Sequence, residues 1–189
     1  MGYYFIGGVL LFIATMLTSN IVIYDLMFLL TSVSLGVYFY STLLSLRKKL
    51  ITIWICSTEV IYYVLNNIVF KSSPLFDSTG YAILSTGIVI MIFMYMHQIL
   101  TNVSDESLWL NFEFWFVASL MIYFLGSFII FLTFNYLTRK ILPDELYSLE
   151  NRHLLDAVWG VHNVLLFLGS LLTLGSVLWI SSHKKSPSS

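Results

Sequence analysis

The chain has 189 residues, of which 58% are hydrophobic and only 10% are charged. A typical soluble domain carries roughly 25% charged residues, so this chain has too few to cover a water-soluble surface. The net charge of −1 offers no basic face for nucleic acid, and the apolar content excludes a disordered chain. The composition therefore predicts an integral membrane protein, and excludes a soluble enzyme and a nucleic-acid-binding protein.

Helical membrane spans are predicted wherever about 20 apolar residues stand between polar segments. Residues 3–46 exceed the length of one span about twofold. Two helices joined by a tight turn are therefore favoured there over one span plus a re-entrant segment. Asp25 is a candidate N-cap of the second helix, and the polar segment 138–155 is predicted as a loop. The six predicted spans are 3–18, 26–46, 50–70, 81–100, 112–137 and 156–180.

These spans predict an all-α fold, a polytopic transmembrane helix bundle. We expect one transmembrane domain, residues 1–181, and a short polar tail, residues 182–189. Lys and Arg are enriched in cytoplasmic loops, and six spans place slightly more of them on the side that holds both termini. Both termini are therefore expected in the cytoplasm. The residues on that side are Arg47, Lys48, Lys49, Lys184 and Lys185, and those on the other are Lys71, Arg139, Lys140 and Arg152.

One acidic side chain lies within a predicted span. Glu59 is near the middle of the third span, which contains no basic residue to pair with it. Asn66 follows seven residues later on the same helical face, and Ser57 and Thr58 are local donors. Ionisable groups inside a membrane are costly and usually face the bundle interior or a water-filled cavity. Glu59 is then either a carboxylate that titrates or contacts a ligand, or a neutral acid hydrogen-bonded between helices.

A histidine lies in the outer half of the sixth predicted span. His162 is followed by Asn163, and Trp159 lies three residues earlier on the same face. His97, in the fourth span, is offset from His162 by roughly 15 Å in depth, which is too far for two ligands of one haem iron. No cofactor and no metal are therefore expected.

We expect Glu59 and His162 to lie at similar depths in the membrane, differing by roughly 5–10 Å. Such a cluster could sense protons or a small ligand, since His titrates near neutral pH. The alternative is a hydrogen-bond network that serves packing alone. The predicted site consists of Glu59, Asn66, Trp159, His162 and Asn163. No catalytic residues are predicted, because the chain contains no nucleophile elbow, zinc-protease motif or phosphate-binding loop.

Two segments of the second half resemble a known group of proteins. Residues 111–116 read NFEFWF and lead into 122–126, IYFLG. A Phe-Trp pair before an Ile-Tyr-Phe-x-Gly stretch resembles multi-pass membrane proteins of Bacteroidetes-type bacteria, which include the membrane sensor regions of histidine kinases. Residues 159–162, WGVH, are similar to the closing Trp-x-x-His helix of those proteins. The resemblance covers roughly residues 110–180.

The resemblance implies a sensory or signalling module in the bacterial inner membrane. No kinase part follows in this sequence, since only residues 181–189 come after Ile180. Output is therefore expected to pass through a partner chain, such as a kinase, a regulator or a complex subunit. We thus expect a non-enzymatic sensory module or accessory subunit. The alternative is a small proton-coupled transporter or pore that uses Glu59 and His162. An intramembrane lipid-modifying enzyme is disfavoured, because Glu59 is the one convincing buried acid.

Overall fold

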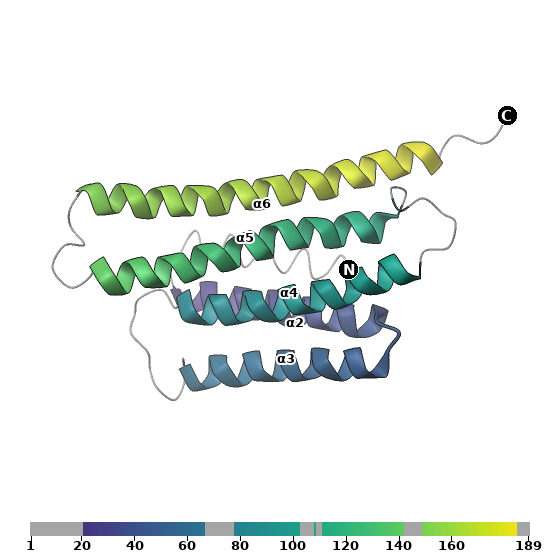
Figure 1. The fold of residues 1–189 in the computed structure, drawn as a ribbon, viewed down its shortest axis with the longest axis horizontal. Coiled ribbons are helices and arrows are strands. Elements are labelled where there is room, and N and C mark those ends of the chain that lie inside the picture. The colour runs from purple at the N-terminus through teal and green to yellow at the C-terminus, as the bar shows by residue number, and fades with distance from the viewer. Residues whose placement is uncertain (1–20, 67–77, 103–107, 109–110, 142–148, 185–189) are drawn as a thin grey trace. The chain divides into compact units, whose positions relative to one another are not determined.

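The computed structural model describes residues 21–66, 78–102, 108, 111–141 and 149–184. The regular elements in these residues are all helices, so the predicted all-α fold is confirmed for the described part of the chain. The first predicted span, 3–18, lies outside the described residues. Figure 1 labels the five helices, which are α2 (Ile21–Thr42), α3 (Leu46–Val64), α4 (Ser78–Thr101), α5 (Phe112–Ile141) and α6 (Leu149–Lys184).

The chain divides into two compact units, Met1–Met91 and Ile92–Ser189, and the boundary falls within α4. The first unit contains α2, α3 and the first part of α4. The second unit contains the rest of α4 together with α5 and α6. The two titratable residues of the predicted site, Glu59 and His162, therefore belong to different units.

In the first unit, α2 and α3 form an antiparallel hairpin (Figure 1). Residues 43–45 are the break between them, and Ser45 has the extended backbone of an N-cap residue, with φ −78° and ψ 126°. The side chain of Leu43 is buried. The turn is therefore short and anchored by an apolar contact, which keeps the two helices side by side.

A buried hydrogen bond joins α4 to α2 in the same unit. The Tyr81 hydroxyl donates to Oδ1 of Asp25 at 2.9 Å, and both side chains are buried. The prediction that Asp25 is an N-cap is wrong, because α2 already runs from Ile21. Asp25 therefore lies within the helix, where its carboxyl group meets another helix instead of capping its own.

In the second unit, α5 and α6 pack as antiparallel neighbours (Figure 1). The absence of a side chain at Gly126 permits this approach, since a Cβ there would overlap the Leu165 side chain. Thr173 donates a hydrogen bond across the pair to the Ser119 hydroxyl at 2.7 Å. Small residues and hydroxyl contacts of this kind are typical of helix pairs that pack within membranes.

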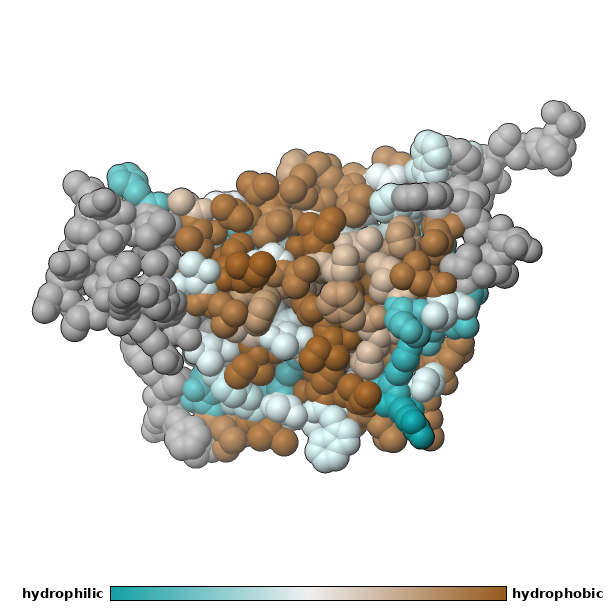
Figure 2. Space-filling model, in the orientation of Figure 1, coloured by the Kyte–Doolittle hydropathy of each residue, from teal (hydrophilic) through white to brown (hydrophobic). Residues whose placement is uncertain are grey.

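Three of the described helices contain segments long and apolar enough to cross a membrane: Thr79–Thr101, Phe112–Phe134 and Ala157–Trp179. Figure 2 shows hydrophobic surface along these helices. This surface supports association with a membrane, because an apolar exterior is costly in water and favourable in lipid. On α6 the exposed apolar side chains include a stripe with helical spacing, made of Val161, Val164, Phe167, Leu171, Leu174 and Leu178.

The helix bounds differ from the predicted spans where the sequence is polar. The basic residues 47–49 were predicted to lie between helices, but the break comes earlier and they form the start of α3. The predicted loop 138–155 is also partly helical, since α5 continues to Ile141 and α6 begins at Leu149. With 36 residues, α6 is about 54 Å long, whereas the hydrocarbon core is about 30 Å thick. Backbone hydrogen bonding therefore continues past the apolar segment that defines a span.

Candidate functional site

Glu59 is held between α3 and α2. Its side chain is 2% exposed, and the Ser32 hydroxyl donates a hydrogen bond to its Oε2. Ser32 lies near the middle of α2 and is fully buried. The hairpin between α2 and α3 brings these two positions together, although 27 residues separate them in the sequence. Ser32 therefore supplies one polar partner to a carboxyl group that is otherwise surrounded by apolar helices.

The second carboxyl oxygen of Glu59 is in a different situation. Oε1 is buried and has no hydrogen-bond partner among the described residues. It lies against Gly87 of α4, where a Cβ would overlap Oε1 and would stand 2.6 Å from Cγ2 of Ile55. Gly87 thus provides the space that the carboxyl group occupies. An unpartnered buried acceptor carries a free-energy cost, so Oε1 is the atom of this site that a donor from outside would stabilise.

A groove of about 420 Å³ lies beside this carboxyl group in the first unit. Its walls are mainly apolar. The one hydroxyl in its lining, that of Thr58, donates to the backbone carbonyl oxygen of Trp54 at 2.8 Å. Glu59 is therefore the ionisable group of the groove. The lining residues are Ile51, Trp54, Ile55, Thr58, Glu59, Ile83 and Gly87.

The neighbours on α3 that were predicted to serve Glu59 lie elsewhere. Ser57 is exposed, and Thr58 is engaged with the backbone of its own helix. Asn66 is half-buried in a short π-helical extension of α3, two residues beyond Val64. The donor that Glu59 uses comes from α2, because residues of its own helix one position away point in other directions.

His162 is the corresponding buried group of the second unit. It lies in α6 with 4% of its side chain exposed. Its Nδ1 is 3.2 Å from the hydroxyl of the fully buried Ser127, and its Nε2 is 3.4 Å from the hydroxyl of Tyr123. Both partners belong to α5. Each ring nitrogen of His162 therefore faces a hydroxyl group on the neighbouring helix.

Aromatic rings surround the imidazole. The ring centroids of Tyr123 and Trp159 each lie 5.4 Å from that of His162, and that of Phe131 lies 5.5 Å away. Trp159 and His162, which the sequence placed on one face, are in edge-to-face contact with an interplanar angle of 88°. Asn163, the next residue, is exposed. The hydrogen bonds and the aromatic contacts together fix the orientation of the imidazole ring.

The structure gives Glu59 and His162 separate surroundings. Glu59 contacts Ser32 and Gly87 of the first unit, and His162 contacts α5 of the second unit. That these two residues form one cluster stays a prediction. Among the residues that the structure describes, no three His, Cys, Asp or Glu side chains lie together as metal ligands would.

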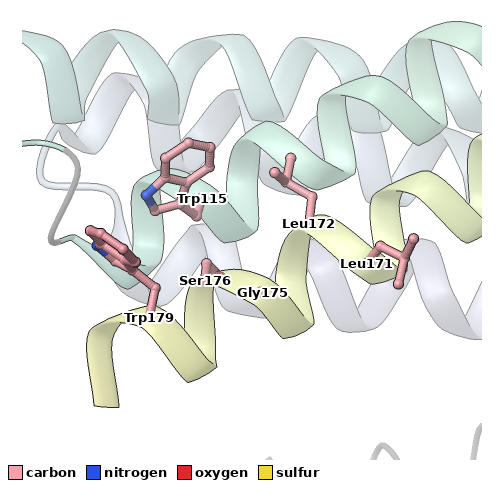
Figure 3. Close-up of a pocket in the computed structure, with 6 residues that line it drawn as sticks. All are labelled: Trp115, Leu171, Leu172, Gly175, Ser176 and Trp179. Carbon is pink, nitrogen blue, oxygen red and sulfur yellow. The ribbon is translucent and has the colours of Figure 1, made fainter. Parts of the chain in front are cut away.

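A second groove, of about 390 Å³, lies between α5 and α6 (Figure 3). Figure 3 shows Trp115 of α5 and Trp179 of α6 at one end and leucine side chains at the other. The Ser176 hydroxyl at its centre donates to the Thr173 carbonyl oxygen at 2.7 Å. This groove therefore presents apolar surface and no free donor from Ser176. The lining residues are Trp115, Leu171, Leu172, Gly175, Ser176 and Trp179.

Sequence reasoning missed the partners that define both sites. Ser32 and Gly87 contact Glu59, whereas Ser127 and Tyr123 contact His162. Serine, glycine and tyrosine are common in membrane helices, so their presence alone marks no site. The available signal was weak: Ser127 and Tyr123 are four residues apart on one helical face, so both can reach the same side chain on a facing helix.

Comparisons with known proteins give no relative. No protein-family model, no curated protein and no solved structure matches the chain. The resemblance to membrane proteins of Bacteroidetes-type bacteria therefore stays a prediction. The functional argument rests on the chemistry of the two buried sites.

Proposed function

We propose that this chain is a non-enzymatic membrane module that senses a change in protonation and acts through a partner chain. The observation that carries this proposal is the pair of hydroxyl groups around His162. Ser127 and Tyr123 lie within 3.2 and 3.4 Å of the two ring nitrogens. A neutral imidazole donates from one nitrogen and accepts at the other, whereas an imidazolium donates from both. A hydroxyl group can donate or accept, so this pair suits both forms.

Protonation of His162 would place a charge between two tightly packed apolar helices. A buried charge without a counter-ion is costly, and the hydroxyl groups offset part of that cost. The part of the cost that is not offset favours a rearrangement of α5 relative to α6 that lets water reach the imidazole ring. Gly126 and Leu165 interdigitate at the contact between α5 and α6. Closely packed helices change between discrete arrangements more readily than they deform continuously. In this proposal the α5–α6 pair is the element that changes state.

Fluorescence of Trp159 tests this proposal, because an imidazolium quenches an adjacent indole more strongly than a neutral imidazole does. The purified full chain in lipid nanodiscs is titrated between about pH 5 and 8, the range in which histidine changes charge. We expect a single reversible transition in emission that is absent in His162→Gln and in Trp159→Phe. His97→Gln is the matched control, because His97 is exposed on α4, and it should keep the transition. A transition that persists in His162→Gln would overturn the proposal.

We further propose that all five described helices, together with residues 3–18, cross the bacterial inner membrane as six spans with both termini in the cytoplasm. Support comes from the three apolar helices and from the excess of Lys and Arg on one side of the predicted spans. Cys56 is the sole cysteine, so a Cys56→Ser background allows labelling of single introduced cysteines. In intact cells a membrane-impermeant maleimide should label Lys140→Cys and spare Lys48→Cys. The opposite pattern would reverse the topology.

The partner chain of the proposal is a kinase, a regulator or a complex subunit, as the resemblance implies. The exposed apolar stripe of α6 gives such a chain, or lipid, a surface to contact. A photo-crosslinking residue at Phe167 should form a specific adduct with one membrane protein in cells. Its yield should differ between His162→Gln and wild type if the two sites communicate. An equal yield in both proteins would contradict the proposed coupling between His162 and the partner.

The alternative function is a small proton-coupled transporter or pore. The unpartnered Oε1 of Glu59 favours it, because a carboxyl group that binds and releases protons beside a groove is typical of proton pathways. Liposomes loaded with a pH-sensitive dye distinguish the two functions. Proton flux that is lost in Glu59→Gln would establish transport. Flux equal to that of empty liposomes, together with an intact Trp159 response, would establish the sensory module.

A further inference from the structure

We propose that the groove beside Glu59 binds a lipophilic amine, meaning one protonated amino group on a compact apolar body. The ammonium group would donate to Oε1 of Glu59, and the apolar body would fill the groove between α3 and α4. This inference concerns the first unit and does not depend on the response of His162.

The first argument is the unsatisfied acceptor. Ser32 already donates to Oε2, whereas Oε1 is buried and has no partner among the described residues. The remaining hydroxyl of the lining, on Thr58, donates to a backbone carbonyl group. The groove therefore offers an acceptor and no available donor of its own, so the complementary ligand must bring the donor. A charged donor is favoured over a neutral one, because it also supplies the counter-charge that a buried carboxylate needs.

The second argument is the shape and polarity of the groove. Its volume of about 420 Å³ lies within the range of sites that bury a small organic molecule. Three isoleucines, Ile51, Ile55 and Ile83, form apolar walls around the single carboxyl group. Trp54 is 73% exposed and also lines the groove. An indole face attracts a cation, so Trp54 and Glu59 both favour a positively charged group.

Other ligand classes fit this groove less well. Ca²⁺ requires six to eight oxygen ligands, and the lining supplies one carboxyl group and one engaged hydroxyl. An anionic lipid headgroup would meet the carboxylate and no basic side chain in the lining. A wholly apolar ligand would leave Oε1 unpartnered. An amine on an apolar body is the class that satisfies the carboxyl group and the isoleucine walls together.

Binding of tritiated adamantylamine tests the inference. The full chain is placed in nanodiscs of zwitterionic phosphatidylcholine, and saturable binding is measured at neutral pH. We expect saturable binding to wild type and affinity about 10- to 100-fold weaker in Glu59→Gln, the range for loss of a hydrogen bond to a charged group. Adamantanol, which has the same cage and no charge, should not compete. Glu113→Gln is the matched control: it removes an exposed carboxyl group of α5, and it should bind as wild type does.

Gly87→Ala gives a second variant, which retains the carboxyl group of Glu59 but displaces it. The added Cβ would overlap Oε1, so we expect it also to weaken binding, by about tenfold. Equal affinity in wild type and Glu59→Gln, or equal competition by adamantanol, would overturn the inference, as would a wild type that binds no amine. These failures are distinguishable from failure of the proposed function. The Trp159 transition can persist without amine binding, and amine binding can persist without the transition.

Discussion

Ser127→Ala is the substitution that measures how strongly the α5–α6 pair depends on His162. It removes the hydroxyl group 3.2 Å from Nδ1, at a position where both side chains are buried. Loss of one partner from a buried hydrogen bond costs about 1–3 kcal/mol. Bonds between membrane helices average about 0.6 kcal/mol and reach about 1.7 kcal/mol. Because Ser127 has no access to solvent, we expect a loss of about 1–2 kcal/mol in the free energy of unfolding, where the two ranges overlap.

Two further variants separate the hydrogen bond from the packing. Tyr123→Phe removes a longer contact, 3.4 Å to Nε2, from a residue that is half-buried. We therefore expect a smaller loss, below about 0.6 kcal/mol. The double variant Ser127→Ala with His162→Phe removes both members of the pair and keeps a ring among Trp159 and Phe131. Replacement of both partners by apolar groups can be nearly neutral, so the double variant should recover most of the stability lost in Ser127→Ala.

Reversible unfolding in mixed lipid–detergent micelles, followed by steric trapping, measures these free energies. Ser170→Ala is the matched control, because Ser170 is exposed on α6 and donates only to the Leu166 carbonyl oxygen of its own helix. It should change stability by less than about 0.5 kcal/mol. The reasoning is refuted if Ser127→Ala costs no more than Ser170→Ala. It is also refuted if the double variant loses as much stability as the sum of the losses measured separately for Ser127→Ala and for His162→Phe.

Three other substitutions test the packing within the two units by the same unfolding measurement. Gly126→Ala should destabilise the protein by about 1–2 kcal/mol, because the new Cβ would overlap Leu165. Gly175→Ala should be neutral or slightly stabilising, because a Cβ there meets nothing within 4 Å; equal effects at the two glycines would contradict the packing described. Tyr81→Phe should cost about 1 kcal/mol, since it removes the buried donor to Asp25. A loss below about 0.3 kcal/mol would show that this hydrogen bond adds no net stability.

The sequence identified two of the buried titratable residues, Glu59 and His162, and missed their partners, for a physical reason. Glu59 and His162 are conspicuous because ionisable groups are rare within apolar segments. Their positions in the chain do not show which helix faces them, and that information depends on how helices pair. Ser32 lies 27 residues before Glu59, and Ser127 lies 35 residues before His162. Spacing along one helix predicts neighbours on that helix, such as Trp159, and nothing on the next.

The ends of the helices are the second feature that the sequence predicted incorrectly. Apolar length predicts where a chain lies in lipid, whereas the helix itself is defined by backbone hydrogen bonds that polar residues also make. The basic residues 47–49 and the segment 149–155 were therefore assigned to loops but belong to α3 and α6. Asp25 was assigned to a helix end for the same reason, although it lies inside α2 and accepts a hydrogen bond from Tyr81.

The hairpin of α2 and α3 has a consequence for how the protein is made. Among the described helices, α3 combines three basic residues at its start with an acidic residue further along, so it partitions into lipid poorly by itself. Its acidic residue Glu59 meets Ser32 of α2, the segment that leaves the ribosome first. If α3 lies in the membrane as we propose, its insertion requires that α2 is still in or beside the translocon when α3 arrives. The two segments then enter the bilayer as one helical hairpin, and a defect in α2 would appear as failed insertion of α3.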